Sequence, residues 1–391
     1  MEGGGLKELC PDQRADRVMI VGHISDTHLG WYSEGAAAEE RENDYYNAFT
    51  EAIDLFIRER VDIVIHSGDI LHNPRPYGTA VGTLIDGVMK LSRNGIPFLF
   101  TLGEHDIASV KSTPYPRILE RLGIGVYIGN GDLHEVKGLT VSGLHKHKRY
   151  ERDTLMQRLE AIASKLPQTA GKGILILHQC IKEAAGPWAE ISLTDIPAGF
   201  DYYAMGDYHG RFTRPHGRGT LSYPGPAHWV DVDDPDKCGV NIVDLSGGEP
   251  IIHWAELESV RPKLRLKVNE EGLESLLNDL MGRSYNKKPC LWLEVVSRDV
   301  VNTDRSESLL KEKYMIQELA VTRPASVSQP TPSPQGQNID EELKRLVVEA
   351  LDGRDDIAGF VLDTLLPALA EKGVKEGSEA VWSYFLKGGW E

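Results

Sequence analysis

Five short apolar runs between residues 17 and 205 each end in a polar or charged side chain. Each run is four to nine residues long and rich in β-branched or aromatic residues, which is typical of buried strands and too short for most helices. The runs are residues 17–25, 62–65, 97–102, 173–177 and 201–205. The pattern therefore predicts five buried strands with polar tips.

Amphipathic stretches lie between the first of these strands. Residues 44–60 place apolar side chains at every third or fourth position, as a helix with one buried face does. Residues 79–92 form a second such stretch, which ends near Asn94 and Gly95. Strands that alternate with helices predict an α/β fold, in which the carboxyl ends of the strands gather at one edge of the sheet. We therefore expect the five polar tips to meet.

The pattern changes after about residue 240. Strand-like runs at 251–254, 263–268 and 290–296, with an amphipathic stretch at 273–281, predict a smaller α+β domain. A Pro/Ser/Gln-rich segment then resembles a linker, and two helical patterns with an aromatic end follow it. The predicted parts are a flexible N-terminal extension (1–16), a large α/β domain (17–245), a small α+β domain (246–322), a linker (323–338) and a helical tail (339–391).

The composition is that of an ordinary globular protein. Hydrophobic residues make up 41% and charged residues 26% of the chain, and no run of about 18 apolar residues occurs. The first 17 residues lack the apolar segment of a signal peptide. The four cysteines form no C-x-x-C pair, which argues against a thiolate zinc site or a disulfide framework. We therefore expect a cytoplasmic protein without a membrane span.

The net charge is −16 at pH 7, which argues against non-specific nucleic-acid binding by the surface as a whole. Residues 338–391 contribute −6 of it, from 12 acidic and 6 basic residues. Local basic clusters matter more than the sum, and one follows residue 145 while another follows the last polar tip. A solvated loop without any such role is the alternative for the first cluster. The candidates for contacts with DNA phosphates are Lys146, Lys148, Arg149, Arg211 and Arg214.

The polar tips carry side chains that bind metal ions. Asp26 and His28 are two residues apart, so in extended chain both can face one ion, and Asp207 and His209 repeat the spacing. Each pair alone is a weak signal, and a lone histidine at a strand end, such as His178, is more often a hydrogen-bonded core residue. Together and in this order they predict a mixed nitrogen and oxygen site for Mn²⁺, Fe²⁺ or Zn²⁺. Two such ions, roughly 3.5–4 Å apart, would share one carboxylate.

In this order the motifs resemble those of the calcineurin-like metallophosphoesterases. Residues 68–76, G-D-I-L-H-N-P-R-P, resemble the G-D-x-x-H-x-x-R-P segment of DNA double-strand-break repair nucleases of the meiotic-recombination-eleven type. That branch's helix motif, R-x-x-D-x-x-x-A-F, is matched by Arg41, Asp44, Ala48 and Phe49. The resemblance covers about residues 17–240 and is architectural beyond them. It implies a two-sheet sandwich flanked by helices (α/β/β/α), a small α+β capping domain and a C-terminal helix pair.

The resemblance also implies a role for each position. The implied ligands are Asp26, His28 and His209 for the first ion, Asp69 for both ions, and Glu104, His178 and Asp207 for the second. His105 would donate to the scissile phosphate or the leaving oxygen, and His72 would orient the DNA strand. The expected cofactor is a pair of Mn²⁺ ions, with Mg²⁺ or Fe²⁺ as alternatives, and an activated water would attack phosphorus in line.

Two positions depart from the family's pattern, which has asparagine in place of Glu104 and histidine in place of Asp207. With Asp26 and Asp69 they give four carboxylates against two divalent ions, so the net charge is near zero instead of about +2. A second site richer in carboxylate favours hard ions such as Mn²⁺ or Mg²⁺ and leaves a higher pKa on the bridging water. The alternative is that Glu104 or Asp207 turns away and only one ion binds firmly.

The leading hypothesis is a metal-dependent DNA exonuclease and endonuclease that acts on double-strand ends, hairpins and single strands in repair. Its expected partner is a coiled-coil ABC-type ATPase bound through residues 339–391, at the nucleoid of the cytoplasm. Helix 79–92 is more apolar than one buried face requires, and the family dimerises through nearby helices, so we expect a homodimer. The alternative is that the capping domain buries this helix. The alternatives are a phosphomonoesterase or cyclic-nucleotide phosphodiesterase, and a nuclease-dead scaffold that bridges DNA ends. The departures from the family's pattern at Glu104 and Asp207 are the only support for the scaffold hypothesis.

Overall fold

The chain forms two compact units, residues 1–323 and 324–391. The predicted N-terminal extension, almost all of the linker and most of the predicted helical tail lie outside the residues that the structure describes. The computed structural model describes residues 19–32, 37–108, 112–165, 171–298, 301, 303–323, 345, 347–348, 354–367 and 381–384.

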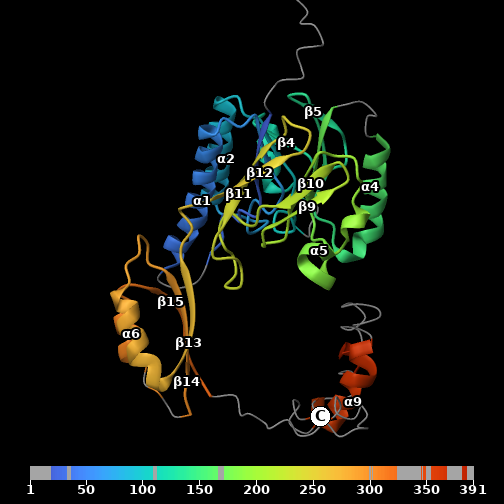
Figure 1. Ribbon diagram of the computed structural model, residues 1–391. Coiled ribbons are helices and arrows are strands. Elements are labelled where there is room, and N and C mark those ends of the chain that lie inside the picture. Colours follow the sequence, from blue (N-terminus) through green and yellow to red (C-terminus); the bar gives the residue numbers. More distant parts are fainter. Residues whose placement is uncertain are drawn as a thin grey trace, which may run out of the picture. The chain divides into compact units, whose positions relative to one another are not determined.

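Two six-stranded sheets form the centre of the first unit (Figure 1). The strands of the first sheet are β1 (Ile20–Ile24), β2 (Ile63–His66), β3 (Phe98–Phe100), β4 (Gly125–Tyr127), β11 (Gly239–Asp244) and β12 (Ile251–Glu256). Those of the second are β5 (His134–Val136), β6 (Leu139–Leu144), β7 (Lys172–His178), β8 (Tyr202–Gly206), β9 (Phe212–His216) and β10 (Gly219–Tyr223). The strand orders are β12-β11-β1-β2-β3-β4 and β5-β6-β7-β8-β10-β9. Because β1–β4 are mutually parallel, and β6, β7, β8 and β10 are too, each sheet has one edge where strand ends gather.

Helices cover the outer face of each sheet (Figure 1). The long ones are α1 (Ala38–Arg58) and α2 (Gly78–Arg93) on the first sheet and α4 (Arg152–Lys165) on the second, and the short ones are α3 (Ile118–Arg121) and α5 (Lys182–Ala185). Three apolar cores separate the four layers. They contain Phe56 of α1 with Val64 of β2, Ile65 of β2 with Ile174 of β7, and Leu159 of α4 with Leu175 of β7. The predicted α/β/β/α sandwich is confirmed.

A smaller α+β layer follows, as its sequence pattern predicts. Its parallel sheet consists of β13 (Lys263–Asn269), β14 (Cys290–Val296) and β15 (Met315–Thr322), covered by α6 (Leu273–Gly282) and α7 (Asp304–Leu310). A separate core holds it together, with Leu280, Leu293, Leu310 and Tyr314 buried. The run at 251–254, which we assigned to this domain, instead lies in β12. It pairs antiparallel with β11 and so belongs to the first sheet, a choice of partner that strand periodicity does not reveal.

A buried ionic network joins α1 to the smaller domain. The guanidinium of Arg261, just before β13, donates to Asp44 Oδ1 at 2.9 Å and to the Lys288 carbonyl at 2.6 Å. Asp44 also pairs with Arg41 at 2.6 Å, and the indole N–H of Trp229 donates to the Arg261 carbonyl at 2.6 Å. Arg41 and Asp44, which carried part of the family resemblance, therefore serve packing in this chain. A buried charge needs such partners, because leaving one unpaired is costly.

The described part of the second unit is helical. α9 (Asp355–Phe360) continues into a π-helical turn, Val361–Leu365, and the Phe360 ring stacks on Tyr384 with centroids 4.0 Å apart. Among the described residues of the whole chain, no helix combines the length and the hydropathy needed to cross a bilayer.

Candidate metal centre

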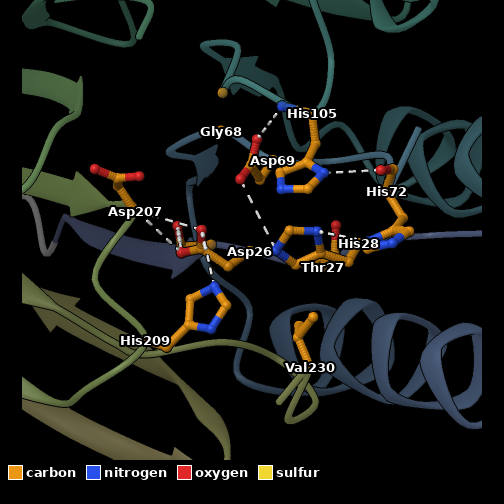
Figure 2. Close-up of polar contacts among 12 residues, drawn as sticks. Asp26, Thr27, His28, Gly68, Asp69, His72, His105, Asp207, His209 and Val230 are labelled. Carbon is orange, nitrogen blue, oxygen red and sulfur yellow. Dashed lines mark hydrogen bonds and ion pairs between the residues drawn. The ribbon is translucent and has the colours of Figure 1, made fainter. Parts of the chain in front are cut away.

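The loops that follow β1, β2, β3, β7 and β8 bring the predicted site residues together. Three of these strands belong to the first sheet and two to the second, so the site lies where the edges of both sheets meet. Figure 2 shows the side chains of Asp26, His28, Asp69 and His209 directed toward one another. The expectation that the polar tips meet is therefore correct for these residues.

The backbone is left-handed at several of these tips. Asp26, His28, Asp69 and Asp207 have φ angles of 49°, 43°, 51° and 87°. Only two other non-glycine residues in the described part of the chain, Arg60 and Lys137, share this sign. Left-handed backbone costs an L-residue roughly 1–2 kcal/mol, and such strain persists mainly where function requires it. Four strained positions in one cluster therefore mark the cluster as functional.

Two glycines allow the loops to approach one another closely. Gly68 has a φ of +103°, and a Cβ there would overlap the ring of His178. A Cβ at Gly103 would overlap the carboxylate of Asp69. The glycine that precedes each ligand-bearing tip is thus needed for space, because any side chain would push two loops apart.

Asp106 ties two of the loops together. Its buried carboxylate accepts hydrogen bonds from the backbone N–H groups of Ile70 (3.2 Å), Leu71 (2.9 Å) and Gly103 (2.9 Å). Burial raises the pKa of Asp106 to about 7, and the nearby Asp69 carboxylate adds to the shift. We did not assign Asp106 a role from the sequence, although a third polar residue at the tip after Glu104 and His105 was the available signal.

One half of the centre consists of Asp26, His28 and His209, whose ligand atoms lie within 4.8 Å of one another. His209 Nε2 is 4.0 Å from Asp26 Oδ1, while His209 Nδ1 is 2.9 Å from the carboxylate of Asp234. Asp234 in turn accepts hydrogen bonds from the backbone N–H of Val230 at 2.7 Å. A carboxylate behind a metal-binding histidine fixes the ring and its tautomer. No sequence motif marks Asp234, so its place behind His209 is apparent only in the structure.

Electrostatics favour a proton on His209. Burial lowers the pKa of His209, but the hydrogen bond with Asp234 and the charge of Asp26 outweigh it and raise the pKa to about 9. The same carboxylates would attract a divalent cation. A metal ion and a proton therefore compete for His209 Nε2.

Asp69 lies at the middle of the centre. Its Oδ2 atom is 3.9 Å from His28 Nε2 and 3.4 Å from His178 Nε2, and its Oδ1 atom accepts the backbone N–H of His105 at 2.9 Å. Asp26, Asp69 and His178 form a second group of metal-capable atoms within 4.8 Å. One carboxylate thus faces histidines from both halves.

Two buried histidine nitrogens have no hydrogen-bond partner, namely Nε2 of His28 and Nε2 of His178. His178 Nδ1 lies 2.7 Å from the Ser67 carbonyl and donates to it, which leaves Nε2 as the nitrogen that faces Asp69, at 3.4 Å. Buried polar atoms are nearly always satisfied, so these two need a partner of another kind. Imidazole nitrogens beside carboxylate oxygens suit a divalent transition metal, and the residues present therefore fit one.

The other half is more strongly ionic. Asp207 Oδ1 is 3.6 Å from His178 Nε2, and Asp207 Oδ2 accepts a hydrogen bond from the Lys146 ammonium at 2.6 Å. Lys146 also donates to Glu190 at 2.7 Å. Burial raises the pKa of Asp207, but His178 and Lys146 outweigh it and hold the pKa below its usual range. We considered that the basic segment is a solvated loop. That interpretation is wrong for Lys146, of which only 9% is exposed.

Glu104 lies apart from the other predicted ligands. Its side chain is exposed, and it belongs to none of the metal-capable groups among the described residues, whereas the other six predicted ligands do. With His105, Tyr208 and Asp234 it lines an open pocket of about 500 Å³ beside Asp69 and Asp207. The substitution at residue 104 therefore places its charge at the mouth of the site.

His72 and His105 stand next to the first half. His105 Nδ1 donates to the His72 carbonyl at 2.9 Å, which leaves Nε2 of His105 for another partner, and the two rings stack with centroids 5.1 Å apart. His72 Nδ1 is 3.3 Å from His28 Nδ1. Burial lowers the pKa of His72 to about 4, and His105 adds to the shift.

The remaining DNA-contact candidates lie at the surface. Lys148 and Arg149 are exposed at the end of the loop that contains Lys146. Arg211 and Arg214 are also exposed, and the Arg211 guanidinium lies 4.3 Å from the centre of the Trp254 ring. Contacts of these four residues with phosphates stay a prediction.

A two-sheet sandwich with paired aspartate and histidine side chains at its shared edge defines a class of phosphoesterases. Residues 19–211 match the calcineurin-like phosphoesterase family.

Several curated relatives narrow the class. The DNA double-strand break repair protein Mre11 of Thermoplasma acidophilum is 30% identical over 303 residues, which cover 73% of this chain and 80% of that protein. The Mre11 proteins of Sulfolobus acidocaldarius (32% over 302 residues, 72% and 77% covered) and Methanocaldococcus jannaschii (26% over 363 residues, 90% and 94% covered) are similar too. The chain belongs to the Mre11 family.

Proposed function

We propose that the protein is a metal-dependent DNA nuclease, both exonuclease and endonuclease, that acts in double-strand-break repair. The observation that carries the proposal is the convergence of five ligand side chains, Asp26, His28, Asp69, His178 and His209, with Asp207 3.6 Å from His178. The Nε2 atoms of His28 and His178 are buried there without a hydrogen-bond partner. Membership in a family whose curated relatives are named for double-strand-break repair supports the choice of DNA as substrate.

Two divalent ions, for which we propose Mn²⁺ with Mg²⁺ or Fe²⁺ as alternatives, would supply a nucleophilic water at neutral pH and positive charge for the phosphate oxygens. Mixed imidazole and carboxylate ligands suit Mn²⁺. The proposed ligands are Asp26, His28 and His209 for one ion, Asp69 for both, and His178 and Asp207 for the other, with Glu104 as a weaker ligand from the pocket side.

His105 and His72 would act on the substrate itself. The hydrogen bond from His105 Nδ1 to the His72 carbonyl fixes the ring, so Nε2 of His105 is the atom left to hold a proton for the leaving oxygen. His72, stacked on His105, would hold the strand in register with it. An open pocket of about 500 Å³ admits a nucleotide, and exposed basic side chains beyond it would contact the phosphate backbone.

The proposed assembly follows the family's pattern. Residues 339–391 would bind a coiled-coil ABC-type ATPase, and the nuclease would act with it at the nucleoid in the cytoplasm. A homodimer would form through helices such as α2, where Val81, Ile85 and Met89 are only half-buried. Deleting residues 339–391 should remove ATPase binding and leave cleavage by the nuclease intact.

Cleavage of a labelled DNA duplex and a labelled hairpin tests the function, with Mn²⁺, Mg²⁺ or a chelator present. We expect Mn²⁺-dependent cutting by the wild type and a loss of at least ~10²-fold in His105→Leu, with Mn²⁺ binding retained. Cutting of a small phosphomonoester but no DNA would favour a phosphoesterase of smaller substrates. ATPase binding through the tail without cleavage of any DNA would favour a scaffold.

A further inference from the structure

A buried lysine stands directly behind the second half of the metal centre. Lys146 follows β6, and its backbone N–H donates to the Leu102 carbonyl at 2.9 Å, which anchors the residue beside the loop after β3. Its side chain is 7% exposed. The ammonium is therefore withdrawn from solvent and is not available to a DNA backbone.

The two oxygens of Asp207 face different partners. Oδ1 is turned toward His178 Nε2, at 3.6 Å, and Oδ2 is held by Lys146 Nζ at 2.6 Å. The opposite side of the ammonium is held by Glu190 Oε1 at 2.7 Å, and Glu190 Oε2 accepts the backbone N–H of Cys180 at 3.3 Å. Each carboxylate is thus held in a fixed orientation, and only Oδ1 of Asp207 is directed at the metal-capable nitrogen.

The positive charge of Lys146 changes what Asp207 can offer a metal ion. A free aspartate offers a divalent ion a full negative charge and two oxygens, whereas a histidine offers one neutral atom. Lys146 offsets part of the charge of Asp207, because Glu190 shares the ammonium, and it leaves Asp207 one free oxygen. Asp207 therefore comes closer to a histidine in charge and matches it in the number of donor atoms. Cys180, Glu190 and Asp207 form another group of metal-capable side chains, with ligand atoms within 4.8 Å of one another. Lys146 already pairs with the two carboxylates of that group.

We propose that Lys146 is a positioning residue for the second metal ion, which compensates the charge of Asp207 and limits it to one oxygen. The second ion is consequently held less tightly than a free Asp207 would hold it, and less tightly than the ion between Asp26, His28 and His209. This inference rests on the proposed two-metal nuclease. It revises the four-carboxylate charge count, since one of those four charges is partly offset by a buried cation.

Mn²⁺ binding, measured without DNA, tests the inference. The protein is stripped with a chelator, and free Mn²⁺ is followed by its electron paramagnetic resonance signal during titration. We expect Lys146→Met to lower the dissociation constant of the weaker ion at least tenfold, because Asp207 regains its charge and both oxygens. Lys182→Met is the matched control, since Lys182 is an exposed lysine at the start of α5, and it should stay within twofold of the wild type. A Lys146→Met protein that binds the weaker ion as the wild type does, or less tightly, would overturn the inference.

Glu190→Gln should act in the opposite direction. It leaves the ammonium to Asp207 alone, so the weaker ion should bind several-fold less tightly, and tighter binding would count against the inference. If Lys146→Met fails to fold because two buried carboxylates are unpaired, the double variant Lys146→Met with Glu190→Gln keeps the net charge. The double variant should still bind the weaker ion at least tenfold more tightly than the wild type.

The count of bound ions separates the remaining outcomes. One ion in the wild type and two in Lys146→Met supports the inference, whereas one ion in both overturns it. Because these measurements involve no DNA, a wild type that cuts no DNA would defeat the proposed nuclease and leave the result for Lys146 standing.

Discussion

The two halves of the metal centre differ less in where their ligands come from than in what stands behind those ligands. In one half, His209 is backed by Asp234, which orients a ring and strengthens its basicity. In the other, Asp207 is backed by Lys146, which takes charge away from a ligand. The strand ends set where each ligand lies, and the residues behind them set how strongly each half attracts a cation.

Removing a ligand from the histidine-rich half should have the largest effect. His28→Ala deletes an unpartnered Nε2 that faces Asp69, so we expect Mn²⁺-dependent DNA cleavage to fall by about 10³-fold or more. Cleavage rate and Mn²⁺ stoichiometry are measured together, and one ion should be lost. His253→Ala, at an exposed position of β12, is the control and should leave both unchanged. Retention of rapid cleavage by His28→Ala would show that this half is not part of the catalytic centre.

Alkaline pH should destabilise the chelator-treated protein through one histidine of each half. The folded-state pKa is raised to about 9 for His209 and about 10 for His178, where the charges of Asp69, Asp207 and Asp26 outweigh burial. Because both values lie above the unfolded value of about 6.5, the stability they add is complete below pH 6.5 and is lost as pH rises through 9 to 10. The loss is on the order of 3 kcal/mol for His209 and on the order of 5 kcal/mol for His178.

Urea unfolding at pH 6, 8 and 10 measures that loss. Mn²⁺ should reduce the fall in the free energy of unfolding between pH 8 and pH 10, because the ion replaces the proton on both histidine rings. His209→Asn in chelator should remove the lower of the two steps and leave the one near pH 10. A pH-independent free energy of unfolding over this range would contradict the prediction.

Weakening the support behind His209 should have an intermediate effect. Asp234→Asn removes the carboxylate that orients the ring, so the tighter Mn²⁺ ion should bind 10–100-fold less firmly, as is typical for partners of metal ligands. Calorimetric titration gives the affinity. Asp233→Asn is the neighbouring control, because the Asp233 side chain is exposed and forms an ion pair with Arg265, away from His209. Equal affinities in the two variants would remove Asp234 from the centre.

Changing Glu104 should have the smallest effect. An exposed carboxylate at the pocket mouth contributes at most about 1 kcal/mol to an ionic contact. Glu104→Asn should therefore change Mn²⁺-dependent cleavage by no more than about fivefold, measured on the same labelled hairpin. A larger loss would make Glu104 a full ligand of the second ion. The two halves would then differ less in how strongly each attracts a cation.

Much of the fold and of the site follows from local patterns. The strand ends and the helices at 44–60 and 79–92 were predictable because periodicity and burial are properties of neighbouring residues. The convergence of His28, Asp69 and His178 was predictable because parallel strands end at one edge. Both inferences needed only the order of residues along the chain.

The residues that tune the site were not predictable in this way. Lys146 lies in a run of basic residues that resembles a solvated loop, and its burial depends on partners 44 and 61 residues away. Asp234 is 25 residues from His209, in a loop without a motif. The sequence offers no reason to pair either of them with the centre, because each pairing joins segments that lie far apart along the chain and meet only in the folded protein.

The left-handed backbone at Asp26, His28, Asp69 and Asp207 bears on how quickly ions exchange. The hydrogen bonds that Asp106 accepts hold the loops after β2 and β3 together, so we expect the loop that carries Asp69 to stay in place during ion exchange. Loading then requires that protons leave the charged histidines and that the incoming ion lose water. Mg²⁺ gives up its water reluctantly. The centre would therefore select among hard cations by the rate at which each one loads, as well as by how firmly it is held.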